Sequence, residues 1–250
     1  MTKIKILTVA LLSLWTLTLS AKDYKASMFG VKSDGTTLNT RSIQKAVDFI
    51  NENGGGRLVF YVGRYLTGSI QLKSNVTIKL EEGAVLVGVT SIYDYIDING
   101  TRSLISADNQ TNIGITGKGV IEGQGAMVLD NISIQIQKGY IKETLAQASP
   151  MLIYMNGCSN VKIEQINLNN ACGKVQSYNK CKDITINKVL IKSTAVAGSG
   201  GILISGCDGL KLTDSFFDTS GAELTSDGTS KNISIINCVN PKGKKILTKQ

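Results

Sequence analysis

A four-residue phrase recurs six times along the chain and restricts the fold more than any other feature. Each copy begins with Asn, Asp or Gly, and its second and fourth residues are Val, Ile or Leu. From residue 160 the copies start 23, 26 and 23 residues apart, whereas the earlier intervals are 37 and 48, which leaves room for longer loops. A repeat of this length indicates a solenoid in which each repeat forms one coil. The copies occupy residues 75–78, 112–115, 160–163, 183–186, 209–212 and 232–235.

Each position in the phrase has a physical reason. Asn, Asp and Gly tolerate a left-handed backbone, so the first position suits a sharp bend between strands. Alternation with a period of two places the second and fourth side chains on one face of a strand. One strand cannot bury that face alone, but stacked coils can bury it by lining a common core. The sequence therefore predicts an all-β fold, a parallel β-helix, as a single domain over residues 22–250.

The open end of such a solenoid would pair with other chains unless it is covered. Asn39 and Thr40 can cap a helix, and the three glycines at 54–56 can end it. We therefore expect an N-terminal capping helix, and we find no equally clear cover in the polar residues 242–250. The apolar residues at helical spacing are Ile43, Ala46, Val47 and Ile50.

Three of the five cysteines fall in the register of the repeat. Cys158, Cys181 and Cys207 each precede a bend residue by two positions. Because neighbouring strands lie about 4.8 Å apart, these thiols should stack as an inward ladder. We interpret them as small buried apolar residues, with disulfide or redox chemistry as the alternative. The chain has no histidine, so a Cys/His zinc site cannot form, and we expect neither a metal nor a cofactor.

Residues 1–21 have the pattern of a signal peptide. Lys3 and Lys5 give a basic start, residues 6–19 are mostly apolar, and Ala21 offers a small residue for cleavage. The alternative is an uncleaved membrane anchor, although the apolar run is short for a membrane span. We expect a protein that is secreted or retained in the periplasm or cell envelope, with no membrane attachment after cleavage.

The charge balance bears on possible partners. Loss of Lys3 and Lys5, with no acidic residue, lowers the formal charge from +8 to +6. A positive surface can favour an acidic polymer, and a basic solvated surface without a partner is the alternative. No dense Lys/Arg run or aromatic-basic motif indicates nucleic acid. We expect a monomer.

Several segments together resemble glycoside hydrolase family 28 of the pectate-lyase superfamily, which contains polygalacturonases and rhamnogalacturonases. The similarity extends from about residue 24 to residue 238. The resemblance implies a right-handed parallel β-helix and a link to the breakdown of acidic, pectin-type polysaccharide. The segments that carry it are 29–35, 39–40, 43–46, 54–60, 65–70, 72–77 and 115–125.

The catalytic pattern of that family is not found at the corresponding places. The family uses one aspartate in Asn-Thr-Asp-Gly and two in Gly-Asp-Asp, followed by Gly-His-Gly. Inverting hydrolysis needs an acid and a base on opposite faces of the sugar. Here residues 198–201 read Gly-Ser-Gly-Gly, residues 218–223 read Asp-Thr-Ser-Gly-Ala-Glu, and the chain has no histidine and no adjacent pair of aspartates. We therefore carry over none of the family's catalytic residues.

Weaker candidates for chemistry lie near those segments. Asp218 and Glu223 flank the altered motif and are candidates for an acid/base pair, with solvated turn residues as the alternative. Tyr154 and Tyr178 are candidate sugar platforms, with packing as the alternative. A lyase would need a base such as lysine, and no recognisable cluster is formed by the lysines of this region. These lysines are Lys174, Lys180, Lys182, Lys188 and Lys192.

Three hypotheses for function follow from these residues. The first is an exported glycan-active enzyme with a rebuilt site. The second is a non-catalytic β-helix that binds polysaccharide or serves as an envelope scaffold. The third is a truncated, inactive hydrolase. Enzymatic activity is left open by the sequence, because the resemblance favours it and the missing carboxylates argue against it.

Overall fold

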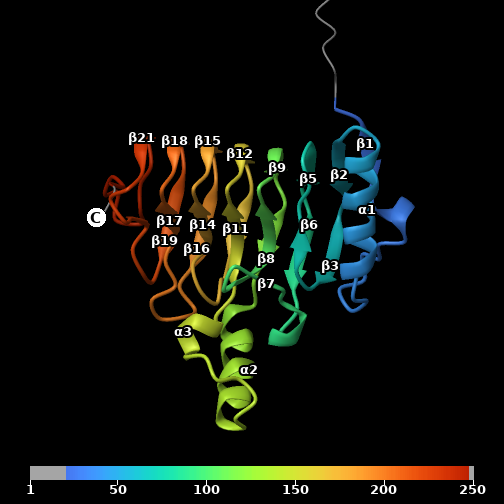
Figure 1. Ribbon diagram of the computed structural model, residues 1–250, viewed down its shortest axis with the longest axis horizontal. Coiled ribbons are helices and arrows are strands. Elements are labelled where there is room, and N and C mark those ends of the chain that lie inside the picture. The colour runs from blue at the N-terminus through green and yellow to red at the C-terminus, as the bar shows by residue number, and fades with distance from the viewer. Residues whose placement is uncertain (1–20, 248–250) are drawn as a thin grey trace, which may run out of the picture.

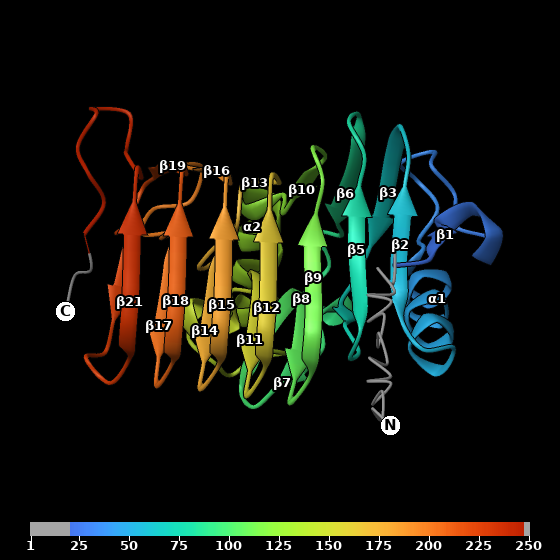
Figure 2. The same cartoon turned by 90° about the horizontal axis from the view of Figure 1, so that it is seen from above.

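The computed structural model describes residues 21–247, which wind into a stack of coils (Figures 1 and 2). Residues 1–20, which contain nearly all of the predicted signal peptide, lie outside the described residues. Three parallel sheets run along the stack, and each of the later coils passes from sheet A to sheet B to sheet C. The predicted parallel β-helix is confirmed.

Sheet A has eight strands, and sheet B has six. The strands of sheet A are, in spatial order, β1 (Asp23–Lys25), β2 (Gly56–Phe60), β5 (Val76–Leu80), β9 (Thr111–Thr116), β12 (Ser159–Glu164), β15 (Lys182–Asn187), β18 (Asp208–Thr213) and β21 (Lys231–Ile236). Those of sheet B are β3 (Gly63–Thr67), β6 (Ala84–Gly88), β10 (Val120–Glu122), β13 (Asn167–Asn169), β16 (Leu190–Ser193) and β19 (Phe216–Thr219).

Sheet C has seven strands, of which six are parallel and joined in order. The seventh, the short β7 (Asp97–Ile98), lies off that path and pairs antiparallel with β8. The parallel strands are β4 (Ile70–Gln71), β8 (Thr101–Asp108), β11 (Met151–Asn156), β14 (Gln176–Asn179), β17 (Ile202–Ser205) and β20 (Leu224–Ser226).

All six copies of the repeated phrase lie in sheet A. Val161 pairs with Ile113 on one side and Ile184 on the other, so the second positions of the phrase form one buried column. The first residue of every copy has a positive φ, as the bend requires. The side-chain amide of Asn112 donates to Asn75 at 2.9 Å, and that of Asn160 donates to Asn112 at 2.8 Å. The repeat therefore aligns the coils both in the core and at the bend.

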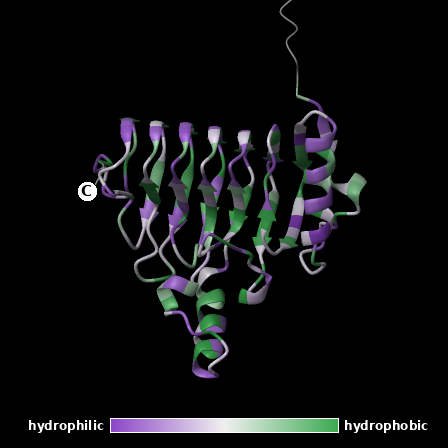
Figure 3. Ribbon diagram, in the orientation of Figure 1, coloured by the Kyte–Doolittle hydropathy of each residue, from purple (hydrophilic) through white to green (hydrophobic). Residues whose placement is uncertain are grey.

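The N-terminal cover is α1 (Thr40–Glu52), which lies at the end of the stack beside β2 (Figure 2). Its four predicted core residues are fully buried, and hydrophilic and hydrophobic segments alternate along it (Figure 3). Asn39 occupies the N-cap position, but its side chain does not cap the helix. The Asn39 amide instead accepts from the Lys32 N–H at 2.8 Å and donates to the Lys32 carbonyl, which fixes the preceding loop.

The C-terminal end differs from the expectation of a polar, uncovered segment. After β21 the chain turns, and Val239 bridges to Phe216 and to Lys245. Ile246 is 4 % exposed, and its N–H donates to the Cys238 carbonyl at 2.9 Å. One apolar side chain among the polar residues therefore packs this short return against the last coil.

The cysteine ladder is present and buried. Cys158, Cys181 and Cys207 are free thiols that are at most 1 % exposed. Each thiol donates to a carbonyl of the preceding coil, at 3.5, 3.3 and 3.3 Å respectively. This arrangement fits the interpretation of the three residues as core packing.

Two insertions account for the long early intervals of the repeat. The 3-10 helix η2 (Ile92–Asp94) and β7 lie between β6 and β8, and α2 (Gly125–Gln137) and α3 (Leu145–Ala148) lie between β10 and β11. Helices α2 and α3 project from the side of the stack (Figure 1). A further 3-10 helix, η1 (Ala26–Phe29), follows β1. Within residues 21–247, none of the helices is long and apolar enough to cross a membrane.

Candidate functional site

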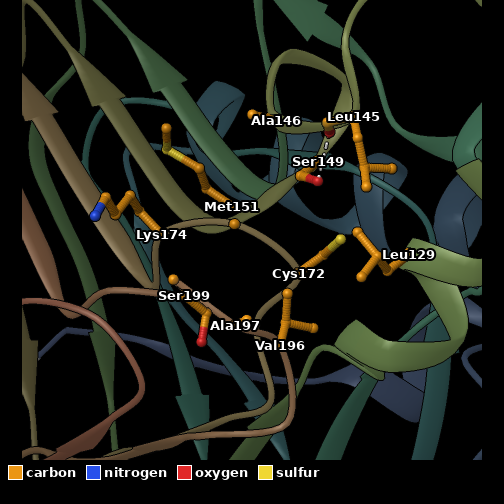
Figure 4. A pocket seen from close by; sticks show the side chains of 12 residues that line it. Leu129, Leu145, Ala146, Ser149, Met151, Cys172, Lys174, Val196, Ala197 and Ser199 are labelled. Carbon is orange, nitrogen blue, oxygen red and sulfur yellow. Dashed lines mark hydrogen bonds between the residues drawn. The ribbon is translucent and has the colours of Figure 1, made fainter.

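A pocket of about 480 Å³ lies where the chain turns from sheet B to sheet C. We call the links between these sheets the B–C corner, namely residues 68–69, 89–100, 123–150, 170–175, 194–201 and 220–223. Leu129 and Leu145 of the helical insertion lie on one side of the pocket, and Met151 and Lys174 lie on the other (Figure 4). Most of the lining is apolar, so a ligand that enters this pocket would leave water and contact apolar side chains with few polar groups among them.

Lys174 provides the cation at the rim of this pocket. Its side chain is half-buried and approaches Gly200 of the next coil. A Cβ added at Gly200 would lie 2.5 Å from Lys174 Nζ and 2.9 Å from the Ala222 carbonyl oxygen, so glycine permits this approach. Among the residues that the structure describes, Lys174 makes no ion pair. A partly desolvated ammonium in this setting is suited to a carboxylate ligand.

A network of serine hydroxyls fixes the corner beside Lys174. Ser199 donates to the Ser193 carbonyl at 2.8 Å, and its hydroxyl lies 3.1 Å from that of Ser220. The Ser193 hydroxyl accepts from the Ala171 N–H at 3.0 Å, which joins the preceding coil to the network. Ser193 and Ser199 are buried, so these bonds are shielded from water and hold the 194–201 turn in one conformation.

Cys172 is the nucleophilic group that the pocket contains. Its thiol is 4 % exposed, and burial raises its pKa, with a smaller opposing effect from Ser149. A raised pKa leaves the thiol protonated near neutral pH, which disfavours its action as a nucleophile. Within residues 21–247 no group of three or more His, Cys, Asp or Glu side chains is arranged to hold a metal ion.

Of the two candidate carboxylates, one stands on a strand and the other stands in the B–C corner. Asp218 lies on β19, in register with Lys192 of β16. Glu223 immediately precedes β20 and accepts a hydrogen bond from the Asn240 side chain at 3.0 Å. Residues 219–222, which are the end of β19 and the first three corner residues, connect them. Their assignment as acid and base stays a prediction.

The two candidate sugar platforms are buried. Tyr178 is fully buried, and its hydroxyl donates to Gln176 Oε1 at 2.5 Å. Tyr154 is 5 % exposed. Burial raises the pKa of both phenols. A sugar platform needs an open ring face, so this placement favours the packing interpretation for Tyr154 and Tyr178.

Sequence reasoning named Lys174 but gave it no role. The sequence predicts a lyase base only from a cluster of lysines, whereas Lys174 is the single lysine among the residues that line this pocket. The sequence does contain one signal for Lys174: this residue directly follows Gly173 and lies one coil before the segment 198–201.

The stacked parallel sheets, the covering helix and the lateral pocket together define a parallel β-helix with a lateral pocket at one corner of its coils. The family model described as "Glycosyl hydrolases family 28" matches residues 59–246. The chain belongs to this family, as its sequence motifs predicted.

Individual relatives agree with that assignment. A crystal structure of a protein described as a candidate glycosyl hydrolase, from Parabacteroides merdae, has 52 % identity and a TM-score of 0.87, and the match covers 92 % of this chain and 100 % of that one. The exo-poly-alpha-D-galacturonosidase of Dickeya chrysanthemi is 24 % identical over 82 % of this chain and 42 % of its own length.

A more distant structure shares the fold. The family 28 exopolygalacturonase of Yersinia enterocolitica has 22 % identity and a TM-score of 0.71, with 88 % of this chain and 45 % of that chain covered. The chain spans about half or less of the length of the first curated relatives that it matches. The activity of those whole proteins therefore enters only as a proposal for this chain.

Proposed function

We propose that this protein binds acidic, pectin-type polysaccharide at the B–C corner, and that Lys174 recognises a uronate carboxylate. The observation that carries the proposal is the half-buried side chain of Lys174, whose Nζ lies against Gly200. Membership of family 28 and similarity to galacturonan-degrading enzymes support an acidic substrate class. A partly desolvated cation gains more from a carboxylate than a fully solvated one, because solvent screens the charge less.

Binding without standard family hydrolysis fits the same residues. In the segment 198–201, which stands where the family has its Asn-Thr-Asp-Gly motif, residue 200 is glycine, and the space beside it holds an ammonium instead of a carboxylate. Inverting hydrolysis needs two carboxylates with room for water between them. Here Asp218 lies beside Lys192, and Glu223 accepts a bond from Asn240. An enzyme with a rebuilt site is an outcome that the experiment below can reveal.

We also infer that the chain is exported through residues 1–21 and meets its polysaccharide outside the cytoplasm. The basic start, the apolar run and the small residue at position 21 support this inference. Fractionation of producing cells tests it: export predicts a protein in the medium or envelope fraction whose N-terminus begins near residue 22. Recovery of the intact chain in the cytoplasm would contradict it.

The binding proposal is tested by titrating the protein with polygalacturonate by calorimetry, for the wild type, Lys174→Met and Lys211→Met. Lys211 is an exposed lysine on β18 of sheet A and provides a matched loss of charge. Removal of a charged hydrogen bond should weaken binding by about 10- to 100-fold in Lys174→Met. Lys211→Met should change the affinity less than about twofold, as expected for a screened surface charge. Equal weakening by both variants would show diffuse charge attraction and overturn the assignment.

The same preparations should be assayed for new reducing ends and for unsaturated uronate. Product that disappears in Asp218→Ala or Glu223→Ala would establish a rebuilt hydrolytic site and overturn binding without hydrolysis. Unsaturated product that disappears in Lys174→Met would show that the lysine acts as the base of a lyase. Binding without either product supports the proposal.

A further inference from the structure

A second pocket, of about 270 Å³, lies beside the helical insertion and shares no lining residue with the first. It is formed by η2, by β8 and by the loop that follows α2. Its volume is close to the lower end of small-ligand pockets, about 300 Å³, which suits one or two sugar units.

Three tyrosines line this pocket, and two of them, Tyr93 and Tyr140, are open to solvent. Tyr93 is 65 % exposed and Tyr140 is 71 % exposed, which makes them the most exposed aromatic side chains in the described part of the chain. Other tyrosines of the fold, such as Tyr95 and Tyr178, are buried in the core. An exposed tyrosine offers a large apolar face with little conformational entropy to lose on binding.

The orientation of Tyr93 is held by α2. Its hydroxyl donates to Gln135 Oε1 at 3.1 Å. The backbone N–H of the neighbouring Ile92 donates to Asn131 Oδ1 at 3.1 Å, which joins η2 to the same helix. A ring held before binding loses less freedom when a ligand arrives, so this placement favours recognition.

The charged residues of the pocket neutralise one another. Arg102 of β8 pairs with Glu143 at 3.0 Å, and the Arg102 side chain is only 20 % exposed. The pair presents N–H donors and carboxylate acceptors side by side, which matches neighbouring hydroxyls that each donate and accept. The backbone N–H of Glu143 and the Arg102 guanidinium hold the pKa of the Glu143 carboxyl below its usual value, so Glu143 is ionised near neutral pH.

We propose that the pocket bounded by Tyr93, Tyr140, Arg102 and Glu143 binds a neutral hexopyranose unit of a polysaccharide. The C–H face of the sugar packs on the tyrosine rings, and its hydroxyls bond to the ion pair. A uronate fits less well, because its carboxylate would approach that of Glu143. This pocket would thus take a neutral sugar, whereas Lys174 would take an acidic one. The proposal for this pocket does not depend on binding at Lys174.

The test uses saturation-transfer NMR and calorimetry with neutral tetrasaccharides built on galactose, glucose or mannose, and with tetragalacturonate as the charged probe. The variants are Tyr140→Ala, Tyr140→Phe and, as a control at the other pocket, Lys174→Met. Loss of one central aromatic contact should weaken binding of a neutral tetrasaccharide by about tenfold or more in Tyr140→Ala. Tyr140→Phe keeps the ring face and should retain affinity within about threefold, and Lys174→Met should leave it unchanged.

Each outcome decides the proposal. Binding of at least one neutral tetrasaccharide that is lost in Tyr140→Ala and kept in Lys174→Met supports it. No binding of any neutral probe, or neutral binding that Tyr140→Ala leaves unchanged, overturns it. Tetragalacturonate binding that Tyr140→Ala abolishes and Lys174→Met leaves unchanged would also overturn it, because the pocket would then select an acidic sugar. Thermal unfolding checks the variants, and the exposure of Tyr140 predicts unchanged stability.

Discussion

The connections on two sides of the solenoid differ greatly in length. Links from sheet A to sheet B and from sheet C to sheet A hold two to four residues, whereas links across the B–C corner range from two (residues 68–69) to 28 (residues 123–150). The repeated bend and its asparagine ladder lie where the short links from sheet C enter the strands of sheet A. Both pockets discussed above lie along the variable corner. Coils that must stack restrict every inward position, but a corner can lengthen outward without disturbing the stack.

The largest expected effect tests the regular side. Ile186 of β15 is fully buried and pairs with Ile163 and Leu212 of the neighbouring coils. Ile186→Ala should lower the free energy of unfolding by about 2–5 kcal/mol, because it removes apolar contacts and leaves a cavity. Leu145→Ala at the corner, where the side chain is 38 % exposed, should cost less than about 1 kcal/mol. Denaturant titration of both variants measures the difference, and equal losses would contradict the contrast between the two sides.

An intermediate effect tests the corner as a binding surface. Gly200→Asp and Gly200→Ala both add a Cβ that must displace Lys174 Nζ, but only Asp adds a charge that can pair with it. Gly200→Asp should weaken polygalacturonate binding by about tenfold relative to Gly200→Ala, because the ammonium gains an internal partner. Calorimetric titration of the two variants gives the ratio. Equal affinities would mean that the Lys174 charge does not contribute to binding.

The smallest expected effect concerns a link from sheet C to sheet A. Asp227 accepts bonds from Ser205 and from the backbone and hydroxyl of Thr229, and these bonds lower its pKa to about 2. Because the folded-state pKa lies below the unfolded value of about 3.9, the carboxylate stabilises the fold above that value and less as the pH falls toward 2.

Asp227→Asn should therefore lower the melting temperature slightly at pH 6, and the difference from the wild type should disappear by about pH 2. Ser205→Ala, which removes one of the donors, should give a smaller shift in the same direction. Melting curves between pH 6 and pH 2 measure both. A difference that is independent of pH would assign the effect to packing instead of ionisation.

Sheet A could be predicted from the sequence because each copy of the phrase meets the same two demands, a left-handed bend and alternating burial. The cover α1 was equally visible, since its buried residues recur at helical spacing. Helix α2 was not visible, because it starts after Gln124 in a left-handed conformation with no side-chain cap. Its two buried apolar residues beyond the first turn, Val128 and Ile132, form only a short stripe.

The candidate site was located in part. The departure from the family motif at 198–201 is local in the sequence, and it pointed to a segment whose residues Gly198 and Ser199 line the first pocket. The approach of Lys174 to Gly200 joins residues of neighbouring coils, and no local pattern reports it. The sequence left Tyr178 open between a sugar platform and a packing residue, because the inward column of sheet C, which pairs it with Met155 and Ile204, is not marked by a repeated phrase.

The 28-residue excursion between β10 and β11 has a consequence in chain entropy. Closing a loop of 28 residues instead of the six at 170–175 costs only about 1.4 kcal/mol, because the cost rises with the logarithm of length. Val128 and Ile132 of the excursion are fully buried, and each such side chain contributes about 1.5–3 kcal/mol. An insertion that buries two side chains therefore offsets its own closure cost. The stack can in this way acquire new surface one corner at a time while its coils stay the same.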